Sequence, residues 1–144
     1  MRIKNNKSGF TLLEIIIVII IVGVLASLAL PRFFSTVEFS RSTEALQSLA
    51  VVRQSMERCY LAQAGTYVGC TAITAGVWNI DVEDPGTSPG THFTYAVGSQ
   101  TATGYSVTAN RNTIDGGATA DWIRLIQSTT GVTRSGTGKF IGIK

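Results

Sequence analysis

The sequence predicts an α+β protein, in which one long N-terminal helix packs against a small antiparallel β-sheet. Three observations predict this fold. An apolar run from Phe10 to Leu30 contains a single ionisable residue, Glu14. Apolar residues then recur at helical spacing as far as residue 64, and after Gly65 they alternate with polar residues as in half-buried strands. The first half of the helix is therefore expected to span a membrane and the second half to be amphipathic.

The first nine residues, MRIKNNKSG, form a short, polar and basic segment. Arg2, Lys4 and Lys7 are three of the twelve basic residues, and removing them leaves nine basic against nine acidic side chains. The net charge of +3 therefore belongs to this segment. Basic residues before an apolar run mark its cytoplasmic side, which indicates a processed tail. The balanced remainder gives no support for a nucleic-acid partner.

The apolar run is about 20 residues long, which is enough for a helix to span a bilayer. Its β-branched stretch Ile15–Val22 would suit a buried strand in a soluble protein, but the run is too long for a strand. Inside lipid, only a helix satisfies all its backbone hydrogen bonds within one segment. A carboxylate such as Glu14 costs about 2–3 kcal/mol at the bilayer centre and is usually functional there. Thr11 and Glu14 also have the spacing of a capping box, and both roles remain possible together.

Pro31 follows the apolar run and has no N–H to donate to the carbonyl of Ser27, so we expect a kink. Beyond it, an apolar stripe at three- and four-residue steps predicts a continued helix of about 50 residues in total that ends near Gly65. The stripe, interpreted as a packing face, comprises Phe34, Val37, Ala45, Leu49, Val52, Met56 and Cys59 or Tyr60. The charged residues fall mostly elsewhere on the helix: Glu38, Arg41, Glu44, Arg53, Glu57 and Arg58.

Short β-rich runs follow the helix, and we expect three or four antiparallel strands that cover the stripe. The candidate strands contain Phe93, Tyr95 and Val97; Tyr105, Val107 and Ala109; Trp122–Gln127; and Lys139–Ile143. Gly98–Gly104 and Asp115–Gly117 are the turn signals between them. Residues 66–91 contain two prolines and are expected to be mostly loop.

The two cysteines, Cys59 and Cys70, both lie after the apolar run. If that run takes the chain across a membrane, both reach an oxidising compartment, where they are expected to pair. The alternative is two unpaired buried thiols in a cytosolic protein. A loop of about a dozen residues closed in this way contributes about 3 kcal/mol to stability.

Enzymatic chemistry has little support in the sequence. The single histidine, His92, sits beside a predicted strand, and no nucleophile, nucleotide-binding or zinc signature is present. Asp81, Glu83 and Asp84 form an acidic cluster that lacks the spacing of an EF-hand, and we interpret it as a solvated turn. We therefore expect no catalytic residue, no cofactor and no metal.

The residues KSGFTLLE, from Lys7 to Glu14, followed by the unbroken apolar run, resemble the class III signal of type IV prepilins and type II secretion pseudopilins. Pro31 also falls where many pilins carry a proline. The resemblance covers residues 7–64 and is only architectural beyond them. It implies that a membrane-embedded prepilin peptidase cuts between Gly9 and Phe10 and methylates Phe10.

The same resemblance implies a pilin-like organisation. Residues 1–9 would be the leader, 10–30 the transmembrane and filament-core helix, and 31–144 the globular domain with the amphipathic part of the helix. The implied function is that of a structural subunit, held in the bacterial inner membrane and drawn by an assembly platform into a helical homopolymer with other pilins at the cell surface. Glu14 would pair with the charged N-terminus of Phe10 on a neighbouring subunit, where a low dielectric strengthens the attraction.

Three other interpretations compete with a pilus subunit. A type II secretion pseudopilin would form a periplasmic filament, although the residues after the helix favour a pilin. A secretory signal peptide cut before Leu30 conflicts with Glu14 in its apolar region and with the length of the run. A single-span, membrane-tethered binding domain that does not polymerise explains the span but not Gly9, Phe10 or the position of Glu14.

Overall fold

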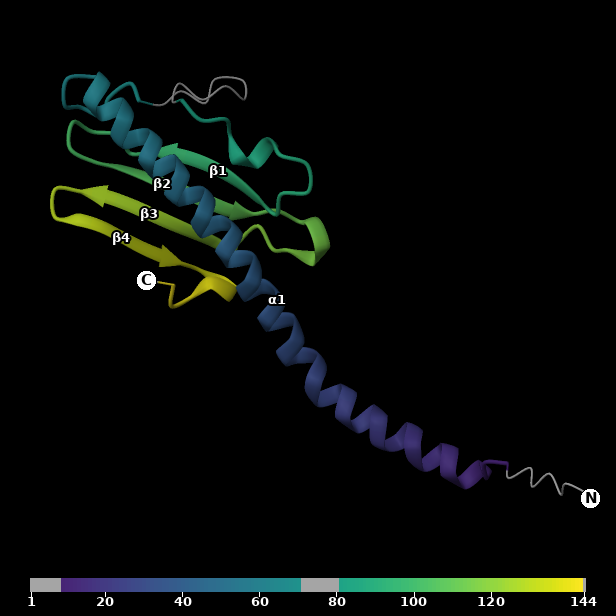
Figure 1. Cartoon of the computed structure of the whole chain (residues 1–144). Coiled ribbons are helices and arrows are strands. Elements are labelled where there is room, and N and C mark those ends of the chain that lie inside the picture. Colours follow the sequence, from purple (N-terminus) through teal and green to yellow (C-terminus); the bar gives the residue numbers. More distant parts are fainter. Residues whose placement is uncertain (1–8, 71–80, 144) are drawn as a thin grey trace, which may run out of the picture. The chain divides into compact units, whose positions relative to one another are not determined.

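The computed structural model describes residues 9–70 and 81–143, so residues 1–8 of the predicted leader and part of the expected loop lie outside the described residues. The chain forms two compact units, one up to Val37 and one from Glu38 onward. Within the described residues the elements are α1 (Leu12–Ala62), η1 (Pro85–Thr87), β1 (Phe93–Gly98), β2 (Tyr105–Arg111), η2 (Ile114–Gly116), β3 (Trp122–Ser128), β4 (Gly131–Gly136) and η3 (Gly138–Phe140), where η marks a 3-10 turn (Figure 1).

The single long helix predicted from the sequence is confirmed as α1, which has 51 residues and contains Pro31. The helix is assigned without a break on both sides of this proline, and the kink stays a prediction. The helix ends in a left-handed turn, with φ values of 55° at Ala64 and 87° at Gly65. The Gly65 N–H donates to the Tyr60 carbonyl over 2.9 Å, the bond that closes a Schellman motif.

The sheet of the described residues is an antiparallel meander in the order β1-β2-β3-β4. The first three predicted strands are confirmed, but the fourth, Lys139–Ile143, is wrong. The fourth strand is Gly131–Gly136, which pairs with β3 from Ile123↔Gly136 to Ser128↔Gly131. Residues 138–140 form a 3-10 turn instead, because Gly138 adopts a left-handed φ of 58° that does not continue a strand.

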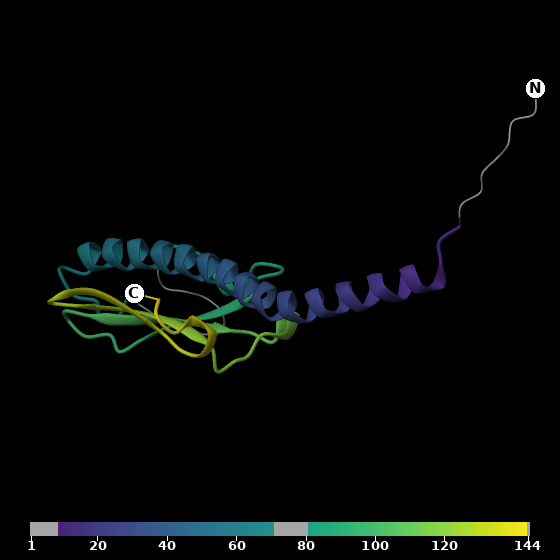
Figure 2. The ribbon, with the colours of Figure 1, turned by 90° about the horizontal axis from the view of Figure 1, so that it is seen from below.

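The hydrophobic core lies between the second half of α1 and one face of the sheet (Figure 2). The helix contributes Ala45, Leu49, Val52 and Met56, and the sheet contributes Phe93, Tyr95, Tyr105, Val107, Ala109, Ile123 and Leu125, with Phe140 beside them. Each large apolar side chain buried here contributes about 1.5–3 kcal/mol. The predicted packing stripe is therefore confirmed from Ala45 to Met56.

The start of the stripe was predicted wrongly. Phe34 is 61% exposed, and the first buried positions of the helix are Glu38 and Ser42. These two side chains are polar, so they can be buried only where the rest of the domain supplies hydrogen-bond partners.

The opposite face of the sheet carries no helix in the described part of the chain (Figure 2). Cross-strand register places Ser106 opposite Ile126 and Thr108 opposite Arg124. Side chains directly opposite each other in an antiparallel pair lie on the same face, so these four residues share the uncovered face.

Candidate functional site

The N-terminus of α1 begins with a complete capping box. The Glu14 N–H donates to Thr11 Oγ1 over 3.2 Å, and the Thr11 N–H donates back to Glu14 Oε2 over 3.1 Å. The Thr11 hydroxyl also donates to Glu14 Oε2, over 3.1 Å. The local role considered for this pair is therefore confirmed: each side chain satisfies an amide that the first helical turn leaves without a partner.

Gly9 and Phe10 precede the helix and are both exposed, Phe10 by 82%. No atom lies within 4 Å of the place where a side chain at Gly9 would begin. The predicted cleavage site is therefore accessible backbone next to a short cap, although cleavage and methylation stay predictions.

Among the described residues, α1 is the one helix long and apolar enough to cross a membrane. Its apolar side chains from Leu12 to Leu30 are exposed, and Glu14 is the ionisable residue among them. The membrane-spanning role therefore rests on the length and apolar composition of this helix.

A second polar feature lies inside the globular unit, around Arg111. This side chain is 1% exposed, and its Nε donates to Glu38 Oε2 over 3.3 Å. Nη1 donates to the carbonyls of His92 (3.1 Å) and Asn112 (3.0 Å), and Nη2 donates to that of Ile114 (2.9 Å). The buried cation thus holds the end of β2, two loops and the helix together.

Further charged residues extend this cluster to the surface. Arg41 donates to Glu38 Oε1 over 2.6 Å and to Asp115 Oδ2 over 3.2 Å. The ring of His92 lies between two carboxylates, with Nδ1 2.9 Å from Glu44 Oε2 and Nε2 3.1 Å from Asp115 Oδ2. Charge-assisted hydrogen bonds are directional as well as strong, so these contacts set the register of α1 against the sheet.

The cations and amides of this cluster shift the pKa values of two glutamates. Burial acts to raise the pKa of Glu38, but the hydrogen bonds and charges of Arg111 and then Arg41 outweigh it and lower the pKa below 4.5. Burial likewise acts to raise the pKa of Glu44, and the N–H and ring of His92, with the Thr91 hydroxyl, lower it overall. Both carboxylates are therefore held in their charged form.

Sequence reasoning missed this cluster because it placed Glu38 away from the packing face. The spacing contained a signal, since Glu38, Ser42 and Ala45 continue the three- and four-residue steps of the buried stripe. No such signal identifies Arg111 as the partner, because it lies 73 residues away in the sequence.

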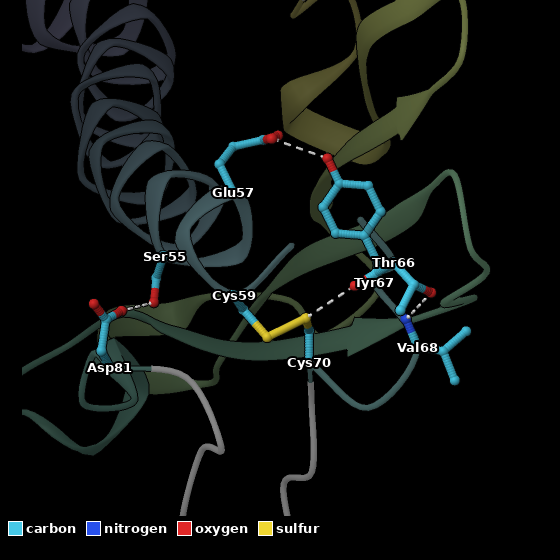
Figure 3. The surroundings of a disulfide bond; sticks show 8 residues. All are labelled: Ser55, Glu57, Cys59, Thr66, Tyr67, Val68, Cys70 and Asp81. Carbon is cyan, nitrogen blue, oxygen red and sulfur yellow. Dashed lines mark hydrogen bonds between the residues drawn. A yellow bond between two sulfur atoms is a disulfide. The ribbon is translucent and has the colours of Figure 1, made fainter. Parts of the chain in front are cut away.

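The predicted disulfide is confirmed between Cys59 on α1 and Cys70, with Cα atoms 5.8 Å apart (Figure 3). The Tyr67 hydroxyl donates to Glu57 over 2.9 Å beside it. Burial, and then the bond and charge of Glu57, raise the pKa of Tyr67 to about 12. The segment that follows α1 is thus tied back to the last turns of the helix.

Asp81, the first described residue after the gap, is also tied to α1. It forms an ion pair with Arg58 (Oδ2 to Nε, 2.6 Å). Figure 3 shows the hydrogen bond that it accepts from Ser55. The hydrogen bond from Arg58 and then that from Ser55 lower the pKa of Asp81 to about 2. Asp84 caps η1 by accepting from the Gly86 N–H over 2.8 Å.

Two members of the predicted acidic cluster therefore have partners within the protein. Over the described ranges, no group of three His, Cys, Asp or Glu side chains is arranged to hold a metal ion.

Comparison with known families gives two matches that divide the chain. Residues 4–30 match the model described as the prokaryotic N-terminal methylation motif. Residues 31–121, more than half of the chain, match the model described as type IV minor pilin ComP, DNA uptake sequence receptor.

Curated relatives fall into two groups. The type IV major fimbrial protein FimA of Dichelobacter nodosus is 29% identical over 119 residues, which is 76% of each chain. The type II secretion system core protein G of Escherichia coli K12 is 37% identical over 57 residues, 40% of this chain and 39% of that protein. A probable minor fimbrial protein of Dichelobacter nodosus is 43% identical over 65 residues, 45% of this chain and 40% of the relative.

No solved structure matches the chain.

Proposed function

We propose that this chain, which belongs to the type IV pilin family, is a structural subunit of a type IV pilus-like filament. One observation carries the proposal: the chain combines a methylation motif over residues 4–30 with similarity to a major fimbrial protein, and that similarity covers 76% of the chain. Members of this family are structural subunits, so the proposed role is assembly rather than catalysis.

The proposed life of the subunit begins with a cut between Gly9 and Phe10 and methylation of Phe10. The prepilin peptidase and the inner-membrane assembly platform are the proposed partners at this stage. The mature subunit would then be held in the inner membrane by residues 10–30 until it is drawn into the filament at the cell surface. Lipid and filament core are similarly apolar, so packing and polar contacts, rather than burial alone, must favour the polymer.

Glu14 is the residue proposed to supply such a contact. In the single chain its Oε2 accepts from the Thr11 amide and hydroxyl, and among residues 9–70 and 81–143 no cation pairs with its charge. The charged N-terminus of Phe10 on the neighbouring subunit is the partner that we propose. In a low-dielectric core an unpaired carboxylate is costly, so the pair would fix the register between subunits as well as attract them.

The test replaces Glu14 in the full-length precursor. Glu14→Gln keeps a side chain that can serve in a capping box, but it removes the charge. We expect normal cleavage and a strong loss of sheared surface filaments, seen by electron microscopy and immunoblotting. Thr11→Val is the matched control, because it disrupts the cap and leaves the Glu14 charge in place. Normal filament yield from Glu14→Gln would contradict the proposal.

Mass spectrometry of the mature protein tests the processing step separately. An N-terminus at methylated Phe10 supports a prepilin, whereas a start at Leu30 identifies a secretory signal peptide. The uncleaved Met1 form found in cells that contain a prepilin peptidase would favour a tethered domain that does not polymerise.

A type II secretion pseudopilin is the alternative within the family. The relative named core protein G supports it, but that similarity covers 40% of this chain. Deletion of the gene separates the two roles. Loss of surface filaments with intact protein secretion supports the pilus, and the reverse result supports the pseudopilin.

The family model for residues 31–121 favours a second candidate function, a minor pilin that binds DNA during uptake. Against it, Arg41, Arg58 and Arg111 are paired with carboxylates, and the sequence predicts no nucleic-acid partner. A gel-shift assay of the detergent-solubilised chain with genomic and scrambled duplexes tests it. Sequence-preferring binding at physiological salt supports DNA uptake, and equal binding of the genomic and scrambled duplexes, or no binding, opposes it.

A further inference from the structure

A hollow of about 290 Å³ lies where the β1–β2 loop meets β3. Most of its lining side chains carry hydroxyl groups: Ser99, Thr101, Thr103, Ser106, Ser128 and Thr129. Arg124 and Ile126 also line it, and none of the described residues around it is acidic. The hollow is thus a hydroxyl-rich site with one cation.

The arginine in this hollow is held in place by its neighbours. Arg124 Nε donates to Thr108 Oγ1 over 3.0 Å, and the guanidinium carbon lies 4.6 Å from the centroid of the Trp122 ring. Within residues 9–70 and 81–143, the two terminal nitrogens of Arg124 form no hydrogen bond. A guanidinium whose plane is already fixed loses little entropy on binding, and its paired N–H groups match the two oxygens of a carboxylate or phosphate.

The hydroxyl groups decide which of these anions fits. Thr101 Oγ1 donates to the Gly104 carbonyl over 3.2 Å, and Ser106 Oγ donates to the Gly98 carbonyl over 3.2 Å. Ser128 Oγ is likewise 3.1 Å from the Gly131 carbonyl. A hydroxyl has one proton, so these three side chains offer only acceptor lone pairs to a ligand. Thr101 Oγ1 already accepts from the Thr103 N–H over 3.4 Å, and Ser128 Oγ lies 2.9 Å from Thr130 Oγ1, so Ser106 has the most acceptor capacity left.

We propose that this hollow binds a sugar acid, a single pyranose ring that carries a carboxylate. The carboxylate would pair with Arg124, and ring hydroxyls would donate to Thr101, Ser106 and Ser128. Ile126, 40% exposed, offers an apolar contact for the C–H face of the ring. The volume is near the lower end for ligand sites, which suits one monosaccharide. A phosphate diester has acceptors only, so it would pair with Arg124 but accept no hydrogen bond from these three hydroxyls.

The site goes beyond the proposed filament role and would give the subunit a function of its own at a surface. It requires only the folded globular unit, so failure of filament assembly in the Glu14 variant leaves it untouched. Its own failure likewise leaves the filament proposal standing.

The test is an NMR titration of the full-length, isotope-labelled chain in detergent micelles. The probe is methyl β-D-glucuronide, and saturating shifts are expected at the amides of Thr101, Ser106 and Ser128 and at Arg124 Nε–H. Methyl β-D-glucoside lacks the carboxylate and inorganic phosphate lacks the ring hydroxyls. Each is expected to bind at least about tenfold more weakly.

Variants assign the contacts. Arg124→Gln is expected to weaken glucuronide binding about tenfold or more, whereas Arg134→Gln, which changes an exposed arginine outside the hollow, leaves it unchanged. Ser106→Ala removes an acceptor and is expected to weaken glucuronide binding while phosphate binding stays the same. If Arg124→Gln does not fold, Ser106→Ala alone tests whether the hollow binds the glucuronide.

Several results would overturn the proposal. These are equal affinity for phosphate and glucuronide, unchanged glucuronide affinity in a folded Arg124→Gln, or no change in Ser106→Ala. Tighter binding of duplex DNA at the same residues would also overturn it, because the ligand would then be a nucleic acid.

Discussion

The charge of Arg111 is stable inside the globular unit because the protein supplies its hydrogen-bond partners. The guanidinium has Glu38 as counter-ion and the carbonyls of His92, Asn112 and Ile114 as acceptors. Space for it depends on Gly117, where an added methyl group would lie 2.5 Å from the guanidinium carbon. An unpaired buried charge is far more costly than an absent pair, so this residue should be among the least tolerant of change.

We predict that Arg111→Met lowers the free energy of unfolding by about 3–5 kcal/mol, because it leaves the buried Glu38 with Arg41 as its remaining cation and removes one donor from each of three carbonyls. Urea unfolding of the full chain in detergent, followed by tryptophan fluorescence, measures the change. The control is Arg134→Met, which removes an exposed arginine and is expected to stay within about 0.5 kcal/mol of the parent. A similar small loss in both variants would mean that the buried pairing contributes little.

Acid should weaken the same cluster. The pKa values of Glu38 and Glu44 are lowered on folding, so their stabilisation is complete above pH 4.5 and is lost as the pH falls through their folded values. We expect the urea midpoint to fall steeply below pH 4.5, and to fall less steeply in Glu38→Gln. Asp81, with a pKa of about 2, should keep its ion pair with Arg58 over most of that range.

Glu83→Gln is the control for this pH series, because Glu83 is exposed and lies outside the cluster. Its profile should follow that of the parent chain. A Glu38→Gln profile as steep as the parent's would show that other groups cause the acid sensitivity.

At the scale of elements, the end of α1 contains an evident imperfection. Ala64 adopts a left-handed φ of 55°, although glycine is the usual residue there. We predict that Ala64→Gly raises the free energy of unfolding by about 0.5–1 kcal/mol, measured by urea unfolding. Ala62→Gly, at the last helical residue, is the control and should be neutral or destabilising. A destabilised Ala64→Gly would contradict the interpretation of the cap.

The elements differ in how far the sequence predicts them. The strands β1, β2 and β3 bury residues on the core face, so their apolar residues alternate and the prediction was correct. The edge strand β4, GVTRSG, is mostly exposed and has one large apolar residue, Val132. This strand forms through backbone hydrogen bonds to β3. Because both of its faces are mostly exposed, its apolar and polar residues do not alternate, and the sequence gives little sign of a strand.

The candidate site shows the same division between local and long-range information. The capping box of Thr11 and Glu14 was readable because the two residues are three positions apart. The pair of Glu38 and Arg111 was not, because propensity and periodicity carry no information on contacts between residues 73 positions apart.

At the scale of the whole molecule, the linker after α1 is held at two points. Cys70 is joined to Cys59, and Asp81 is bound by Ser55 and Arg58, so the described residues on either side of the gap are tied to neighbouring turns of one helix.

We predict that the double variant Cys59→Ser, Cys70→Ser lowers the free energy of unfolding by about 3 kcal/mol, the loop-closure contribution for a separation of 11 residues. Urea unfolding of the globular unit measures it, with the parent chain in reducing agent as a chemical equivalent. Amide exchange from Leu12 to Leu30 should not change. Equal stability of the two forms would mean that other contacts already restrain the linker.

The start of α1 at Leu12 has a consequence for the proposed cleavage between Gly9 and Phe10. A protease must bind its substrate as an extended strand, and a bond inside a helix is exposed only after several turns have opened. The bond between Gly9 and Phe10 lies outside the helix, and the capping box begins one residue later. A cut there would require no unwinding, so the rate of maturation should be insensitive to the helical stability of the membrane segment. The capping box satisfies the first turn of α1, so cleavage at the proposed bond would not depend on opening of the proposed membrane-spanning helix.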